Sequence, residues 1–131
     1  MSNFSIPGSQ STPAIDGDWD HGILSMQGDS YPENSYELFQ QVFSWVERFL
    51  LEAGRPLTLE LRLLYLNTSS IKAMMDILDL LEEAHHDGKP VAVNWRYDPR
   101  NERVAELAEE FKEDCTFPFA IVALDSAASA S

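Results

Sequence analysis

Apolar residues recur at two different periods along this chain, and the two periods alternate. Residues 57–66, LTLELRLLYL, have an apolar residue at every second position, which is typical of a β-strand with one buried face. This alternation predicts that Tyr65 shares the buried face of four leucines. Residues 34–53 instead repeat apolar side chains every three or four positions. That spacing predicts an amphipathic helix with the inner residues Tyr36, Phe39, Val42, Phe43, Val46, Phe49 and Leu50.

The remaining patterns predict four more strands and two more helices. Residues 12–28 predict two short strands joined by a turn rich in Gly and Asp. A second helix follows residue 70, with the inner residues Ile71, Met74, Met75, Leu78 and Leu81. Residues 91–95 and 119–124 predict two short buried strands. Residues 98–115, between them, predict a third helix with Pro99 in its first turn.

Local signals support two of these helices. Asn34 is followed three residues later by Glu37, which resembles a capping box at the start of the first helix. Gly54 ends that helix. Lys72 and Asp76 have the spacing of an ion pair on the outer side of the second helix.

Strands that alternate with helices predict an α/β fold. We expect one domain over residues 12–124, with a mixed sheet of four to five strands layered with helices and its later strands parallel. Residues 1–11 and 125–131 are polar or low in complexity, so we expect both ends to be flexible. Binding in such sheets gathers where parallel strands end and helices begin.

The net charge narrows the classes of partner. The formal charge is −13 at pH 7, and the chain holds only nine Lys and Arg. Nucleic acids and anionic membranes are both bound through clustered cations, so we expect neither as a partner. A protein partner should be neutral or basic at the contact.

Cysteine use and the N-terminus indicate the compartment. The one cysteine, Cys115, excludes an internal disulfide and an all-cysteine metal site. The first residues do not have the basic start and apolar run of a secretion signal, and no apolar stretch is long enough to span a bilayer. We therefore expect a cytoplasmic protein.

Three consecutive hydroxyl residues, Thr68, Ser69 and Ser70, separate the strand at 57–66 from the next helix. One of them suffices as an N-cap that accepts a hydrogen bond from a free amide of the first turn. The alternative is that Thr68 accepts a phosphate, because the start of a helix is a favourable place for an anion. Spacing alone leaves both interpretations open, although capping is the commoner use.

Asp16, Asp18 and Asp20 alternate as they do at the start of a calcium loop. His21 stands where that loop needs Gly, and Gln27 stands where it needs Glu. A hairpin turn is therefore the better account of these aspartates.

The other candidate metal-binding and catalytic motifs are also incomplete. His85 and His86 are adjacent near a helix end, and Glu83 adds only one further ligand type at suitable spacing. No phosphate-binding Gly-rich loop, Cys-His pairing or nucleophile elbow is present. We therefore expect no metal, no cofactor and no catalytic residue in this chain. If the chain were an enzyme, the three consecutive hydroxyls would be its suspected nucleophiles.

Two stretches taken together are more specific. GDSYPENS at 28–35 and YLNTSS at 65–70 resemble the signature of the SiaC family of small bacterial regulatory phosphoproteins. The resemblance covers residues 12–124. It implies a fold similar to the STAS domains of anti-sigma-factor antagonists and implies that Thr68 is the phosphate acceptor. Family members are expected to carry more acids where this chain has Pro99 and Arg100.

The family resemblance also implies a set of partners. A Ser/Thr kinase of the histidine-kinase-like ATPase type, using ATP and Mg, would phosphorylate Thr68, and a metal-dependent Ser/Thr phosphatase would reverse this. The unphosphorylated protein would bind and activate a diguanylate cyclase, which raises cyclic di-GMP and promotes biofilm growth and aggregation. An alternative is a partner-switching antagonist that sequesters a kinase-like anti-sigma factor. The remaining hypotheses are that the chain is itself an enzyme or that it is a scaffold protein.

If the strands ending near Gln27, Leu66 and Arg96 are parallel, the turns after them share one edge. We expect this edge to be the docking surface for kinase or partner. We also expect Ser69 or Ser70 to cap the helix, which leaves Thr68 exposed. The predicted docking residues are Tyr31, Glu33, Asn34, Asn67, Ser69, Ser70, Asp98 and Arg100.

Overall fold

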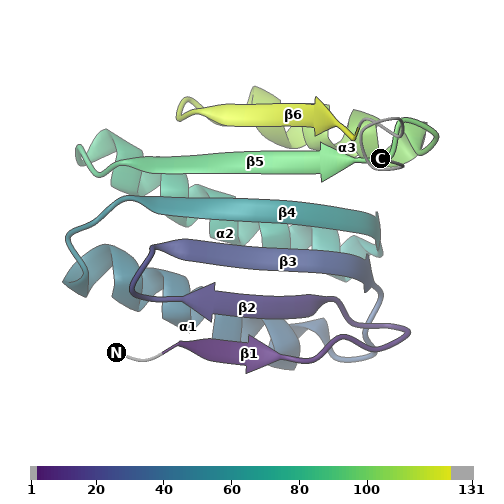
Figure 1. Cartoon of the computed structure of the whole chain (residues 1–131), viewed down its shortest axis with the longest axis horizontal. Helices are drawn as coiled ribbons and strands as arrows, with labels where there is room; N and C mark the ends of the chain where they lie inside the picture. The colour runs from purple at the N-terminus through teal and green to yellow at the C-terminus, as the bar shows by residue number, and fades with distance from the viewer. Residues whose placement is uncertain (1–2, 125–131) are drawn as a thin grey trace, which may run out of the picture.

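The computed structural model describes residues 3–124, which form one α/β unit of six strands and three helices (Figure 1). The predicted α/β class and the single domain are therefore confirmed, with more strands than the four to five expected. The predicted flexible end at 125–131 lies outside the described residues. In chain order the elements are β1 (Phe4–Ile6), β2 (Ala14–Asp18), β3 (Ile23–Ser30), α1 (Ser35–Glu52), β4 (Leu57–Leu66), α2 (Thr68–His86), β5 (Val91–Tyr97), α3 (Glu102–Glu113) and β6 (Phe119–Ala123).

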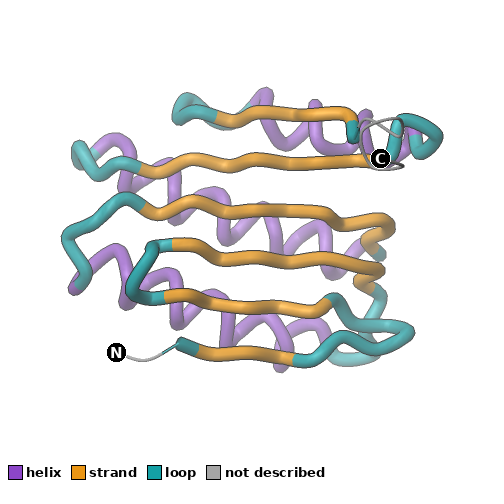
Figure 2. The backbone as a smooth tube through the Cα atoms, viewed as in Figure 1, coloured by secondary structure: helices purple, strands orange, loops and turns teal. Residues whose placement is uncertain are grey.

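The strands lie in one sheet in the order β1-β2-β3-β4-β5-β6. β1, β2 and β3 pair antiparallel, whereas β3, β4, β5 and β6 pair parallel, as predicted for the later strands. Each crossover through a helix leads to the next strand along the sheet. Right-handed crossovers in one direction bring their helices to one face. The three helices accordingly lie together behind the sheet in the view of Figures 1 and 2.

The core lies between this helix layer and the sheet. The four alternating leucines at 57–63 in β4 are almost completely buried, as their spacing predicts. Trp95 of β5 is fully buried and stacks on Phe111 of α3, with 5.6 Å between the ring centroids. Trp45 and Phe49 of α1 stack in the same way at 5.6 Å.

The prediction that Tyr65 joins the buried leucines is wrong, because a β-bulge interrupts the alternation. Gly28 pairs with Leu63 and Asp29 pairs with Tyr65, so Leu64 is an extra residue in β4. Gly28 has φ of 113°, a conformation that glycine adopts without strain. Leu64 and Tyr65 are consequently 47% and 54% exposed.

Residues 4–6, within the end that we expected to be flexible at 1–11, form strand β1, which the sequence prediction missed, and residues 1–2 lie outside the described residues. The Phe4 ring lies 5.7 Å from that of Trp45, and Ser5 donates a hydrogen bond to Asp16 at 2.7 Å. Its alternate residues, Phe4 and Ile6, are partly buried against the core, which favours the strand. Its short length and polar surroundings hid this pattern in the sequence.

Three smaller expectations also need correction. Tyr36 and Met75, which we placed on inner helix faces, are 75% and 46% exposed. Each sits at the margin of its apolar stripe, where spacing does not separate buried from exposed positions. α3 begins at Glu102, so Pro99 lies in the preceding turn; Asn101 caps the helix by accepting a hydrogen bond from the Val104 amide at 3.2 Å.

Candidate functional site

Parallel strands β3, β4 and β5 end at one edge of the sheet, as predicted, and a helix begins after each of them (Figure 1). An asparagine caps each of these helices. Asn34, Asn67 and Asn101 accept hydrogen bonds from the amide three residues later, at 3.1, 2.9 and 3.2 Å. Three helix N-termini, with their partial positive charge, therefore share this edge.

Asn67, and neither serine, caps α2. The prediction that Ser69 or Ser70 caps the helix is therefore wrong. The side-chain oxygen of Asn67 accepts a hydrogen bond from the backbone amide of Ser70. The backbone amide of Asn67 donates to the carbonyl of Ser30 at 2.9 Å. Asparagine is as good an N-cap as serine, and its position one residue earlier makes Thr68 the first residue of the helix.

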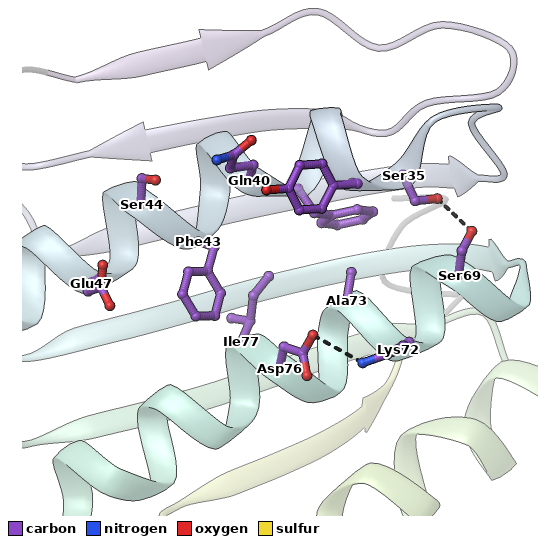
Figure 3. Close-up of a pocket in the computed structure, with 12 residues that line it drawn as sticks. Ser35, Gln40, Phe43, Ser44, Glu47, Ser69, Lys72, Ala73, Asp76 and Ile77 are labelled. Atoms are coloured by element: carbon purple, nitrogen blue, oxygen red, sulfur yellow. Dashed lines mark hydrogen bonds and ion pairs between the residues drawn. The ribbon is translucent and has the colours of Figure 1, made fainter.

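The two serines hold neighbouring elements together. The hydroxyls of Ser70 and Ser30 lie 2.8 Å apart, and both side chains are fully buried. The hydroxyl of Ser69 lies 2.7 Å from that of Ser35, the first residue of α1 (Figure 3). These two bonds join the start of α2 to the end of β3 and to the start of α1.

Thr68 has a different environment from its two neighbours. Its side chain is exposed, and within residues 3–124 its hydroxyl makes no hydrogen bond. A free hydroxyl at the first turn of a helix is accessible to another protein's active site. It also lies where the helix amides favour an added anion.

An aromatic pair lies at the same sheet edge. The rings of Tyr31 and Tyr65 meet edge to face with their centroids 6.0 Å apart, and the side chains are 39% and 54% exposed. Leu64 is exposed beside Tyr65 in the chain, and its carbonyl accepts a hydrogen bond from Asn101 at 3.0 Å. The sequence prediction missed Tyr65 because the bulge turns it away from the buried leucine face, whereas Leu64 lies on the open face by alternation alone.

Asp98 and Arg100 form an ion pair within the turn before α3. Arg100 donates two side-chain hydrogen bonds to Asp98, at 2.6 and 3.0 Å, and its backbone amide donates a third at 2.9 Å. These bonds lower the pKa of Asp98 to about 2, the side-chain bonds contributing most, and raise the pKa of Arg100. The positive charge of Arg100 is therefore largely balanced within its own turn.

The structure removes one residue from the predicted docking set and adds two. Ser70 is 0% exposed, so its hydroxyl cannot contact a partner, and its role is the buried bond to Ser30. Asn67 is half-buried by its capping role, and Glu33 and Asn34 are exposed. The exposed members follow the carboxyl ends of β3, β4 and β5, and the exposed Leu64 and Tyr65 lie at the end of β4 itself.

The remaining candidates are accounted for by local contacts. Asp18 accepts hydrogen bonds from the backbone of His21 at 3.1 Å and lies 2.8 Å from its ring. The backbone bond is the main reason that the pKa of Asp18 is lowered. His86 pairs with Glu82 at 3.0 Å, and not with Glu83. Within residues 3–124 no three His, Cys, Asp or Glu side chains are grouped as metal ligands.

No helix in the described part of the chain combines the length and apolar character needed to cross a membrane.

Comparison with known proteins gives one family. The chain matches the family described as SiaC family regulatory phosphoprotein over residues 6–124. An uncharacterized protein of Pseudomonas aeruginosa strain UCBPP-PA14 is 77% identical over 125 residues, which is 95% of this chain and 99% of that protein.

Solved structures give the same result. The crystal structure of apo-SiaC from Pseudomonas aeruginosa has 75% identity and a TM-score of 0.90, and the match covers 93% of this chain and 99% of that one. A chain in the crystal structure of the diguanylate cyclase SiaD in complex with its activator SiaC, also from Pseudomonas aeruginosa, has 77% identity and a TM-score of 0.90. That match covers 92% of this chain and 99% of the other.

Proposed function

The chain belongs to the SiaC family of regulatory phosphoproteins, and on this premise we propose that it is a switch controlled by one phosphate on Thr68. In its unphosphorylated form it binds and activates a diguanylate cyclase, and thereby controls cyclic di-GMP and biofilm growth or aggregation. The phosphorylated form does not. The complex of the 77% identical SiaC with the cyclase SiaD supports the choice of partner.

The environment of Thr68 carries this proposal. Ser69 and Ser70 are each bonded to another hydroxyl, and Asn67 caps the helix. Thr68 alone in this run is both exposed and unbonded within the described residues. A kinase can therefore use its hydroxyl without breaking a contact that holds the fold.

The chemistry belongs to the kinase and the phosphatase. The Thr68 oxygen attacks the γ-phosphorus of ATP held with Mg on a cognate Ser/Thr kinase, the bond to the β-phosphate breaks, and ADP leaves. A base on the kinase takes the hydroxyl proton. A metal-dependent Ser/Thr phosphatase then hydrolyses the phosphothreonine, which releases inorganic phosphate and restores the Thr68 hydroxyl. This chain provides the acceptor and a docking surface, and no catalytic residue.

Charge and hydration explain why one phosphate suffices. Phosphorylation adds about −1.5 to −2 charge and three strong acceptor oxygens. Arg100 is already bonded to Asp98, and Lys72, one turn after Thr68, lies 3.7 Å from Asp76. A dianion that a partner covers without supplying a cation loses its water at high cost, so binding is lost.

Mass analysis tests the acceptor. We expect incubation with the cognate kinase, ATP and Mg to add a single phosphate, mapped to Thr68 by peptide mass. Thr68→Ala should accept none, while Ser69→Ala, the neighbouring control, still accepts one. A Thr68→Ala protein that takes up phosphate stoichiometrically would contradict the assignment.

Partner capture tests the second half of the proposal. The immobilised, unphosphorylated chain should retain a diguanylate cyclase from lysate, and the phosphorylated chain should not. Capture of a kinase-like anti-sigma factor in place of the cyclase would indicate the alternative, a partner-switching antagonist, and would contradict the cyclase assignment.

A further inference from the structure

A chain of hydrogen bonds leads from α1 to the turn that carries Thr68. The hydroxyls of Ser35 and Ser69 lie 2.7 Å apart (Figure 3), and the Ser69 hydroxyl donates to the side-chain oxygen of Asn67 at 3.2 Å. The same oxygen accepts a hydrogen bond from the backbone amide of Ser70 at 2.9 Å. Ser35 of α1 is therefore connected, through Ser69, to the residue that caps α2.

The number of protons sets the direction of this hydrogen-bond chain. A serine hydroxyl carries one proton, so it donates only one hydrogen bond. Because Ser69 donates its proton to Asn67, the proton between the two serines belongs to Ser35. The Asn67 oxygen has two lone pairs, and its two donors, the Ser69 hydroxyl and the Ser70 amide, occupy both. Each hydroxyl thus donates toward the cap.

The Ser35 hydroxyl serves α2, although Ser35 belongs to α1. The cap of α1 is Asn34, which accepts a hydrogen bond from the Glu37 amide at 3.1 Å. In the part of the chain that the structure describes, the Ser35 hydroxyl bonds only to Ser69. Ser35 is 8% exposed, so another protein has little access to it. Any effect of this hydroxyl on the acceptor must therefore pass through Ser69.

We propose that Ser35 is a positioning residue for the phosphorylation of Thr68. The hydrogen-bond chain holds Asn67 and Ser69, the residues on either side of Thr68, so the backbone at the acceptor is fixed while its own hydroxyl stays exposed. A kinase then receives the acceptor in one orientation and does not have to order the turn itself. Ordering a residue costs conformational entropy, and a small misplacement of a reacting atom slows a reaction by a large factor.

The inference rests on the proposed function, because it takes Thr68 as the acceptor, and it deepens that function by adding a residue that sets the rate of the switch. Its effect should fall on kcat and not on KM. Ser35 is too buried to belong to a docking contact, so the kinase should bind equally well without its hydroxyl. Fewer of the bound complexes would then hold the Thr68 oxygen in line with the γ-phosphorus of ATP, and the chemical step would slow.

Three variants of α1 test the role of the hydroxyl. With the cognate kinase, ATP and Mg, Ser35→Ala should lower the kcat of phosphorylation about 5-fold or more and leave KM within about 2-fold. Ser35→Thr restores a hydroxyl, and the groove of about 700 Å³ that Ser35 lines has room for the added methyl group. It should therefore recover the wild-type kcat to within about 2-fold. Ser44→Ala, the same change at an exposed position of α1, should have no effect.

A stability control separates positioning from a general loss of stability. Val93→Ala removes buried atoms from the middle of the sheet, where Val93 pairs with Leu59 and Phe119, and should lower the melting temperature. It should leave kcat within about 2-fold at a temperature where thermal melts show every variant to be folded. If kcat instead follows the melting temperature in both Val93→Ala and Ser35→Ala, the positioning role is overturned.

A double variant tests the route through Ser69. Ser69→Ala breaks the hydrogen-bond chain at its middle, so this protein should still accept one phosphate but with a lowered kcat. If the effect of Ser35 passes through Ser69, then Ser35→Ala causes no further loss in the Ser69→Ala background. Losses that multiply in the double variant would contradict the chain.

The outcomes separate this inference from the proposed function. If wild type is phosphorylated on Thr68 and Ser35→Ala reacts with the same kcat, the positioning role fails, although the switch stands. A raised KM at an unchanged kcat would make Ser35 part of a docking contact and would also overturn the inference. If wild type takes up no phosphate on Thr68, the proposed function itself fails, and this inference fails with it.

Discussion

At the scale of single residues, three adjacent hydroxyls have three different environments. Ser70 is buried against Ser30, Ser69 bonds to Ser35, and Thr68 faces solvent. Substitution of a residue with a buried hydroxyl leaves the hydrogen-bond partner unbonded, whereas an exposed hydroxyl can be modified without such a loss. The same type of group therefore stabilises the turn at two positions and is available to a kinase at the third.

The buried pair gives a stability prediction. Ser70→Ala leaves the Ser30 hydroxyl buried without a partner, so the free energy of unfolding should fall by about 1–3 kcal/mol. Urea denaturation measures the loss. The double variant with Ser30→Ala should lose less than the sum of the single losses, because neither hydroxyl is then left unbonded.

Ser69→Ala is the control for this pair, since Ser69 is exposed and its bond to Ser35 is only partly buried, so that water can take the place of the lost hydroxyl. Its loss should stay below about 1 kcal/mol. Equal losses at the two serines, or strict additivity in the double variant, would contradict the account of the buried pair.

The Asp98 and Arg100 pair gives a prediction on pH. A pKa lowered in the folded protein, from 3.8 to about 2, means that the ionised Asp98 favours the fold. This contribution is present above pH 3.8 and is lost as the pH falls through about 2. Carboxyl NMR should show Asp98 titrating near pH 2, and Arg100→Ala should raise its pKa toward 3.8. An unchanged pKa in that variant would rule out Arg100 as the cause.

At the scale of elements, asparagine caps set the three helix N-termini that meet at the functional edge. Asn67 matters most because it fixes both the start of α2 and the position of Thr68 as its first residue. It also ties this start to the end of β3 through the Ser30 carbonyl. Thr68, the proposed acceptor, thus lies on a turn that is held from two sides.

Removal of this cap should weaken the protein measurably. Asn67→Ala should lower the free energy of unfolding by about 1 kcal/mol, and Asn67→Ser, which keeps a capping oxygen, should restore most of it. Chemical denaturation of the three proteins makes the comparison. If Asn67→Ala is as stable as wild type, the cap does not hold the turn.

Sequence patterns predicted most helices and strands, but they did not predict the irregularity within β4. The leucines of β4 and the stripe of α1 are periodic enough to indicate a strand and a helix directly, and Asn34 with Glu37 indicates a cap. The exposure of Tyr65 depends on the bulge at Leu64, which is set by pairing with Gly28 more than thirty positions earlier in the chain. No local pattern encodes such a register shift.

The site was predicted to a similar extent. The shared edge follows from parallel strands, whereas the assignment of Thr68 as phosphate acceptor comes from the YLNTSS motif and stays a prediction. The cap at Asn67 was missed because serine and asparagine are equally good caps, and only the backbone geometry distinguishes them. The burial of Ser70 depends on Ser30, a residue 40 positions away.

At the scale of the whole molecule, a sheet with all helices on one face brings three helix starts to one edge (Figure 2). One phosphate at that edge changes the charge of a chain that already carries −13. Because the phosphate lies at the favourable end of α2, it should not unfold anything. The proposed switch is then a local change of surface on an unchanged fold.

This gives a prediction for the phosphorylated protein. Its melting temperature should be equal to or a few degrees above that of the unphosphorylated protein, because a helix N-terminus stabilises a dianion. Amide NMR shifts should be confined to the start of α2 and the neighbouring ends of α1 and β3. Shifts spread over β5, β6 and α3 would indicate refolding and would contradict a local switch.

The most direct test of the central claim is the rate at which SiaD makes cyclic di-GMP in the presence of this chain in its two states. The unphosphorylated chain should activate the cyclase, and the chain carrying one phosphate on Thr68 should activate it at least 10-fold less. Thr68→Ala should activate equally before and after treatment with kinase. Equal activation by both phosphorylation states of the wild-type chain would contradict the account.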